Sequence, residues 1–176
     1  MENKKKNLII RRLLIALVIL ALAVLQSIRG GINEIFGIRA LILIPAVVAA
    51  AMYEREIAGV LYGLLAGALW DIFASGNNFN AIFLVITGFV SAMLINIFMR
   101  NNFVTHLIIS TGAAGIYSLI YWLYHFVIIN SGGAFYMLVR YYLPGVILTA
   151  VLSPLIFLLI RALEKKYYTD INSLYV

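Results

Sequence analysis

The chain has 176 residues, of which 64% are hydrophobic and 11% are charged, and its mean hydropathy is +1.03. A soluble domain carries about 25% charged residues, because water must solvate its surface. The composition therefore excludes a soluble globule and predicts a single polytopic membrane domain over residues 1–176. The net charge of +6 comes without a basic groove containing interleaved aromatic residues, which argues against nucleic-acid binding. The absence of cysteine excludes disulfides and cysteine metal sites.

Six apolar segments suit membrane-spanning helices, each of which needs about 20 mostly apolar residues. The second segment is short, so it is extended backwards to include Arg39, whose side chain reaches the interface. The sixth begins near Pro144 in its first turn and should be kinked at Pro154. The expected spans cover residues 8–28, 36–53, 57–74, 81–99, 103–129 and 143–163. The sequence thus predicts an all-α integral membrane protein with six transmembrane helices.

The distribution of Lys and Arg predicts the orientation of these spans. Most of the 13 basic residues fall on one side of the predicted topology, whereas Arg29, Arg39 and Arg140 fall on the other. Basic residues are enriched in cytoplasmic segments. Both termini are therefore expected in the cytoplasm, which agrees with an even number of spans.

The third segment carries small residues at a regular spacing. Gly59, Gly63, Gly67 and Asp71 recur every four residues, so they line one helix face. Glycines at this spacing let another backbone approach closely, which favours helix packing inside the bundle; a substrate channel or a partner-protein groove are the alternatives. Asp71 lies near the outer boundary. It either caps the turn at residues 75–78 or has a packing or functional role.

This segment resembles the rod shape-determining protein MreD family. The resemblance rests on Gly63-x3-Gly67-x3-Asp71 followed by Ser75-Gly76 and an Asn-rich turn, preceded by the acidic turn at residues 53–56. It covers residues 40–166 in layout and residues 53–76 in detail. It implies a non-enzymatic subunit of the bacterial cell-wall elongation complex in the cytoplasmic membrane, which supports cell shape and peptidoglycan synthesis. The implied partners are an MreC-like bitopic membrane protein, MreB and the RodA–transpeptidase synthase. The family fold is similar to that of the six-helix substrate-capture subunits of energy-coupling-factor vitamin transporters.

The remaining polar residues suggest no catalysis, cofactor or metal site. No nucleophile–base motif or phosphate-binding loop occurs, and the chain has two histidines. His125 belongs to an aromatic belt at one interface, and His106 is expected at the other interface. Glu54 and Glu56 are expected in a solvated turn. The basic ends are expected to attract anionic membrane lipids without selecting a particular lipid.

A small-solute carrier, such as a vitamin-capture subunit, is the alternative to a structural subunit. A carrier needs convergent polar groups in a cavity, whereas the polar residues expected within the spans are sparse Ser, Thr and Asn. The first span also lacks the Ala-x3-Ala surface with which such capture subunits are expected to dock their coupling protein. The two classes differ in one observable property, the uptake of a solute.

Overall fold

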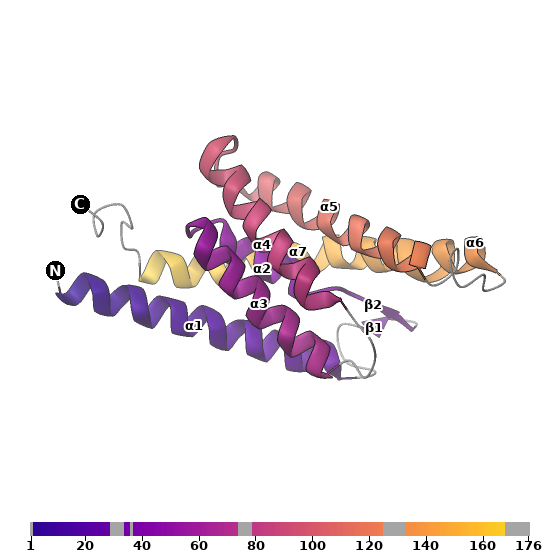
Figure 1. Ribbon diagram of the computed structural model, residues 1–176, viewed down its shortest axis with the longest axis horizontal. Coiled ribbons are helices and arrows are strands. Elements are labelled where there is room, and N and C mark those ends of the chain that lie inside the picture. Colours follow the sequence, from indigo (N-terminus) through magenta and orange to yellow (C-terminus); the bar gives the residue numbers. More distant parts are fainter. Residues whose placement is uncertain (1, 29–33, 36, 74–78, 125–132, 168–176) are drawn as a thin grey trace.

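The computed structural model describes residues 2–28, 34–35, 37–73, 79–124 and 133–167 and forms an elongated bundle of helices (Figure 1). Within these ranges, five helices have the length and apolar composition needed to cross a bilayer. The chain is therefore an α-helical, multi-pass membrane protein. Its elements are α1 (Glu2–Ser27), β1 (Glu34–Ile35), β2 (Ile38–Arg39), α2 (Leu43–Ala51), α3 (Glu56–Phe73), α4 (Asn80–Ile97), α5 (Phe103–Trp122), α6 (Ala134–Met137), the π-helical turn η2 (Leu138–Tyr142) and α7 (Leu143–Lys166).

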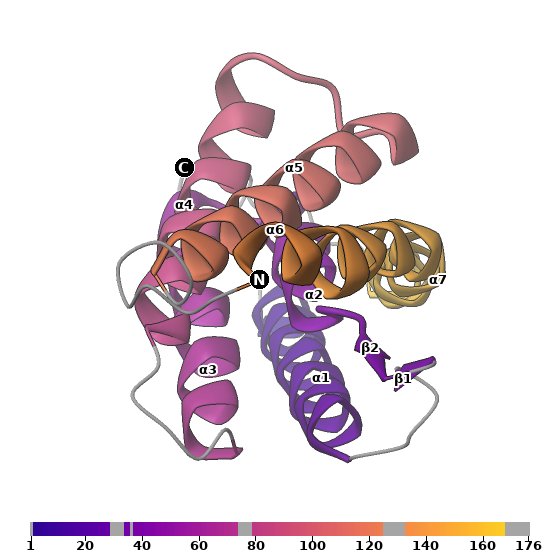
Figure 2. The same cartoon turned by 90° about the vertical axis from the view of Figure 1, so that its right-hand side faces the viewer.

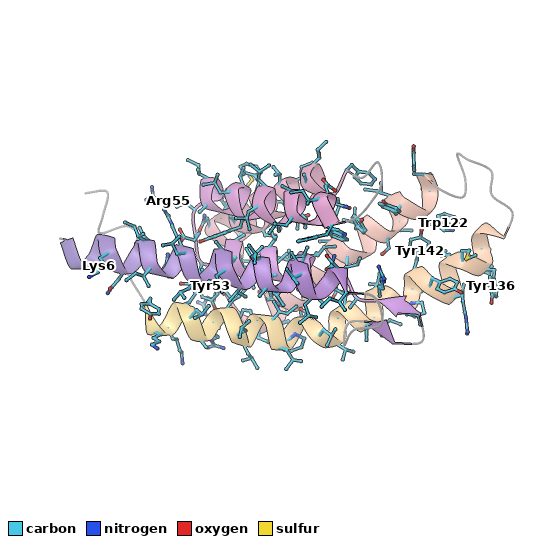
Figure 3. The ribbon with its side chains drawn as sticks, turned by 90° about the horizontal axis from the view of Figure 1, so that it is seen from below. Lys6, Tyr53, Arg55, Trp122, Tyr136 and Tyr142 are labelled. Carbon is cyan, nitrogen blue, oxygen red and sulfur yellow. The ribbon has the colours of Figure 1, made fainter. Side chains whose placement is uncertain are left out.

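The two ends of the bundle differ in chemistry. Lys6 and Arg55 lie at the end where α1 begins and α7 finishes, here called the basic end (Figures 1 and 3). Trp122, Tyr136 and Tyr142 lie toward the opposite end, here called the aromatic end (Figure 3). Tyr and Trp gather where a membrane meets water, because their rings are apolar and their tips are polar. The aromatic end thus has the composition of a membrane interface.

Helix α2 forms the centre of the bundle. All nine of its residues are buried, and it packs against α1, α3, α4, α5 and α7. Figure 2 shows these helices arranged around it. Its sequence, LIPAVVAAA, is apolar on every side, as expected of a helix with no solvent-facing surface. Its many alanines let the surrounding helices come close.

The expected continuous helix over residues 36–53 is wrong, because only Leu43–Ala51 is helical. Before α2 the chain forms a two-stranded antiparallel hairpin, in which Ile35 pairs with Ile38, and then runs as non-helical backbone through Ala40. Nine helical residues rise only about 13 Å, less than half of the hydrocarbon thickness of about 30 Å. Non-helical backbone therefore stands where further helical turns were expected.

The backbone just before α2 and at its first residue obtains hydrogen bonds from neighbouring side chains. The Leu41 N–H donates to Thr149 Oγ1 at 2.9 Å, and the Leu43 N–H donates to Gln26 Oε1 at 3.0 Å. The Thr149 hydroxyl in turn donates to the Gly145 carbonyl at 2.7 Å. Irregular backbone at membrane depth is tolerated only where protein surrounds it and satisfies its polar groups. Thr149 and Gln26 meet this requirement from α7 and α1.

The last helical segment begins earlier than the sequence predicts. Helical structure starts at Ala134, so Pro144 lies inside a long helical segment and not near its beginning. Proline lacks an N–H and its ring clashes with the carbonyl four residues before it. The π-helical turn η2 ends at Tyr142, two residues before Pro144, and its wider winding provides the local adjustment that a proline needs. Helix α7 continues through Pro154.

Candidate functional site

The glycines of α3 face α4 at close range. A Cβ atom built on Gly59 would lie 2.6 Å from the carbonyl oxygen of Gly88, and one built on Gly63 would lie 2.7 Å from the carbonyl carbon of Leu84. Real Cβ atoms do not approach backbone this closely. The glycine face is therefore filled by α4, and neither a channel nor a partner helix occupies it in this conformation. The absence of side chains lets the two backbones touch.

Asp71 closes this interface at the aromatic end. Its Oδ2 accepts a hydrogen bond of 3.0 Å from the backbone N–H of Ala81, in the first turn of α4. A Cβ built on Gly67, one turn earlier on α3, would lie 2.9 Å from the same Ala81 nitrogen. A carboxylate at a helix N-terminus satisfies an unpaired donor and faces the positive end of the helix dipole. Asp71 therefore caps the neighbouring helix, which is a packing role. Residues 75–78, the turn that was the alternative target of its cap, lie outside the described residues.

A buried group of charged side chains lies at the basic end. Arg11 is 2% exposed, and it contacts Glu54 Oε1 at 2.5 Å and Glu164 Oε2 at 3.1 Å. Arg12 adds a contact of 2.7 Å to Glu54 Oε2. These four residues, the charged cluster, come from α1, the turn before α3, and the last turn of α7. The expectation that Glu54 lies in a solvated turn is wrong, since its side chain is fully buried.

The charged cluster is balanced, with two guanidinium and two carboxylate groups. Removing a charge from water costs several kcal/mol per ion unless partners and hydrogen bonds compensate it. Both oxygens of Glu54 accept hydrogen bonds from guanidinium groups, whereas Arg11 Nε and Glu164 Oε1 are buried without a hydrogen-bond partner among the described residues. The cluster ties three distant chain segments together. Such a buried pair fixes one arrangement, because any other would leave a charge uncompensated.

His106 was expected at an interface, but it lies in the interior of the bundle. It is fully buried. Its Nε2 lies 3.1 Å from the carbonyl oxygen of Pro45, which can only accept, so Nε2 carries the proton. Its Nδ1 then accepts from the Ser153 hydroxyl at 3.2 Å, and Ser153 Oγ lies 2.9 Å from Ser110 Oγ. This polar chain joins α2, α5 and α7. Since all three side chains are buried, this chain of hydrogen bonds cross-links the three helices.

A second interior polar contact lies toward the aromatic end. The Tyr117 hydroxyl donates a 2.5 Å hydrogen bond to Oδ1 of Asn80, whose side chain is buried. The Tyr117 ring is surrounded by aromatic neighbours, with centroid distances of 5.2 Å to Trp70, 5.1 Å to Phe83 and 5.3 Å to Tyr121. These separations suit edge-to-face and offset ring contacts. The aromatic cluster joins α3, α4 and α5.

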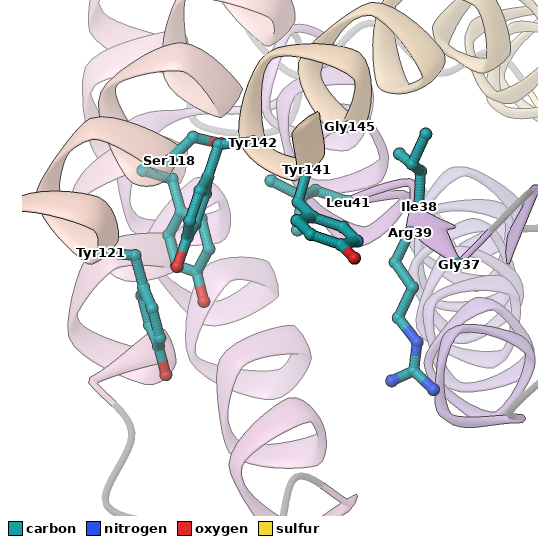
Figure 4. Close-up of a pocket in the computed structure, with 10 residues that line it drawn as sticks. Gly37, Ile38, Arg39, Leu41, Ser118, Tyr121, Tyr141, Tyr142 and Gly145 are labelled. Carbon is teal, nitrogen blue, oxygen red and sulfur yellow. The ribbon is translucent and has the colours of Figure 1, made fainter. Parts of the chain in front are cut away.

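Beside this cluster is a chamber of about 390 Å³, here called the tyrosine chamber. It lies between the β1–β2 hairpin, α5, η2 and the start of α7. Figure 4 shows Tyr121 and Tyr142 on one side and Tyr141 with Arg39 on the other. Its polar lining residues are Arg39, Tyr117, Ser118, Tyr121, Tyr141 and Tyr142. Its volume falls within the range of about 300–1,000 Å³ that is typical of ligand pockets.

The structure assembles the expected site only in part. Gly59, Gly63, Gly67 and Asp71 share one interface, as their spacing indicates, whereas the charged cluster, the His106 chain and the tyrosine chamber were not anticipated. The adjacent Arg11 and Arg12 within an apolar segment could have indicated a buried acidic partner, but they were interpreted as interfacial. His125 lies outside the described residues. Among the residues described, no group of three or more His, Asp or Glu side chains is placed to bind a metal.

Architecture and composition define the class of this protein as a multi-pass, α-helical membrane protein whose long helices enclose a short buried one. No protein-family model, curated protein or solved structure matches the chain.

Proposed function

We propose that this protein is a non-enzymatic membrane subunit of the bacterial cell-wall elongation complex, of the kind formed by the MreD family. The observation that carries the proposal is the segment Gly63-x3-Gly67-x3-Asp71, in which the glycines pack against α4 and Asp71 caps that helix. The motif that gives the resemblance therefore has a structural role here. A subunit that other membrane proteins bind must keep a fixed arrangement of its helices. The interface between α3 and α4 helps to fix that arrangement.

The interior contacts favour a structural role for this protein over a catalytic role. The charged cluster, the His106 chain and the aromatic cluster each cross-link three chain segments, and their central side chains are buried. Such contacts fix how the helices are arranged relative to one another. In this proposal, an MreC-like bitopic protein binds the outer surface of the bundle, since the glycine face is already filled by α4. MreB and the RodA–transpeptidase synthase act nearby in the same complex, and both termini face the cytoplasm.

Depletion of the protein in its bacterial host tests this function. We expect cells to lose their rod shape or change their width, while fluorescent wall precursors are incorporated in a disturbed pattern. Affinity capture from native membranes should recover a bitopic partner. Normal shape and normal wall incorporation after full depletion would contradict the proposal.

A small-solute carrier is the second candidate, and the tyrosine chamber favours it. The chamber has convergent hydroxyl groups and one guanidinium group, which the sparse polar residues of the sequence did not lead us to expect. The same depletion experiment separates the two functions. Loss of uptake of a vitamin with unchanged cell shape would favour the carrier.

A further inference from the structure

The helical segment formed by α6, η2 and α7 is longer than a bilayer is thick. It is helical throughout from Ala134 to Lys166, and the apolar span within it, Phe135–Lys166, has 32 residues. At about 1.5 Å per residue this span measures roughly 48 Å, whereas the hydrocarbon core of a bilayer is about 30 Å thick. A tilt of about 40°, the upper end of the usual range, shortens it only to roughly 37 Å. Part of the segment therefore lies outside the hydrocarbon core.

Two residues mark where this segment crosses the boundaries of the hydrocarbon core. Arg161 is an exposed cation near the basic end of α7, and Tyr142 lies toward the aromatic end (Figure 3). Such side chains gather at membrane interfaces. The 19 positions from Tyr142 to Arg161 rise about 29 Å, which matches the core thickness of about 30 Å. The 20 residues of α5, which end at Trp122, rise about 30 Å as well. Tyr142 therefore lies at the boundary, and α6 and most of η2 lie beyond it.

Beyond Tyr142 the segment rises past the lipid headgroups. Phe135 lies seven positions earlier in the chain, which places it about 10 Å farther from the hydrocarbon core. A headgroup layer is only about 5–8 Å thick. Figure 1 agrees, since α6 extends beyond the ends of α1 and α3 at the aromatic end of the bundle. The exposed surface of α6 therefore faces water and not lipid tails.

The exposed surface of α6 and η2 is largely apolar. Its exposed fractions are 76% for Phe135, 63% for Tyr136 and 48% for Val139, and Arg140 is exposed beside them. These four residues, here called the projecting face, lie at spacings of one and four, so they share one side of the helix. A contiguous apolar patch in water marks an interaction site. Aromatic residues and Arg are also enriched where proteins bind one another. The projecting face therefore has the position and composition of a protein-docking surface.

The charge of the projecting face distinguishes a different protein from a second copy of this chain. In a symmetric dimer, both copies use the same patch. Two Arg140 side chains would then approach each other, and the projecting face contains no carboxylate to pair with them. Juxtaposed like charges cost affinity at an interface. A partner that offers an apolar surface and a carboxylate opposite Arg140 has no such cost.

We propose that the projecting face is the docking surface for the part of the MreC-like bitopic partner that stands outside the membrane at the aromatic end. This inference rests on the proposed function and adds the surface that holds the partner. Phe135 and Tyr136 pack against an apolar area of the partner, and Arg140 pairs with one of its carboxylates. The contact lies above the bilayer, so it does not require a groove between the membrane helices.

Cysteine accessibility tests the height of the projecting face, because the chain contains no cysteine of its own. Phe135→Cys and Leu155→Cys are compared in lipid nanodiscs, which leave both membrane surfaces open to a charged maleimide. Both residues are exposed on the protein, but Leu155 lies in the middle of α7 among lipid tails. We expect Phe135→Cys to react at least about tenfold faster, because charged groups are expelled from hydrocarbon. Equal rates would place the face in the bilayer and overturn the proposal.

Two pairs of variants test the docking itself. The full-length MreC-like protein of the same bacterium is titrated against this chain in mixed micelles, and the dissociation constant is measured. Phe135→Ser and Arg140→Glu should each weaken binding about tenfold, as the loss of an interface anchor does. Their controls at the basic end, Phe98→Ser and Arg100→Glu, should leave binding unchanged, although Phe98 is equally exposed at 75%. All four positions are exposed, so the variants should fold.

The possible outcomes separate this docking surface from the proposed function. Equal effects of a variant and its control would overturn the docking surface. A dimer of this chain alone that Phe135→Ser dissociates would assign the face to a second copy and overturn it too. Loss of rod shape on depletion, together with unchanged binding by Phe135→Ser, would refute the docking surface and leave the proposed function standing. No binding of the partner to the unaltered chain would contradict both.

Discussion

Replacing Glu54 by Gln tests the charged cluster. The substitution keeps the size of the side chain but removes its charge, so Glu164 is the anionic partner that Arg11 retains among the described residues. The cluster then changes from balanced to a net positive charge at a site where Arg11 is 2% exposed. Breaking a buried ion pair by removing one partner destabilises a protein by about 3–5 kcal/mol. We expect a loss of this size for Glu54→Gln, measured as the free energy of unfolding in mixed micelles.

Glu56→Gln provides a matched control two residues away. Glu56 accepts a hydrogen bond from Asn96 at the exposed surface, and the same chemical change there should alter stability by less than about 0.5 kcal/mol. Replacing the charged residues together, with Arg11→Met and Glu54→Gln, should recover part of the lost stability, since the uncompensated charge disappears. Equal effects of Glu54→Gln and Glu56→Gln would refute the argument that burial makes this cluster important.

Three further predictions concern the helix contacts and the topology. Gly63→Leu places a branched side chain against α4, and overpacking of this kind costs about 1–3 kcal/mol. It should lower the melting temperature of the purified protein, whereas the control Gly112→Leu should not. Equal melting temperatures of the two variants would contradict the described packing. Asp71→Ala removes the cap on α4 and should cost about 1 kcal/mol in unfolding experiments, with Asp71→Asn retaining part of it; no loss in either variant would exclude a capping role. Reporter fusions at the two termini should both report the cytoplasm, and an external C-terminus would contradict the proposed orientation.

The glycine interface could be predicted from the sequence because its signal is local. Residues four apart share a helix face whatever the rest of the chain does, so Gly59, Gly63 and Gly67 had to lie together. The same periodicity could not identify α4 as the helix that fills this face. On α4, Gly88 meets Gly59 and is followed four residues later by the buried Ala92, but such a spacing does not say which helix is the partner.

The charged cluster and the chamber could not be predicted because they join distant segments. Arg11 and Glu54 are 43 residues apart, and each by itself resembles an ordinary interfacial residue. His106 was placed at an interface because Asn101 and Asn102 precede it, whereas α2 and α7 bury it. Hydropathy also cannot show whether an apolar segment is surrounded by lipid or by protein. The short α2 was therefore mistaken for a full membrane span.

The hydrogen bonds of the extended stretch before α2 constrain how the protein is assembled. Leu41 depends on a hydroxyl group from α7, which is synthesised more than 100 residues later, since the pair is separated by 108 positions. Until α7 arrives, the Leu41 N–H has no protein partner in the hydrocarbon, where an unsatisfied polar group costs several kcal/mol. The stretch should therefore remain near the aqueous interface during synthesis. It enters its final depth only when α7 docks, so the centre of the bundle is completed last.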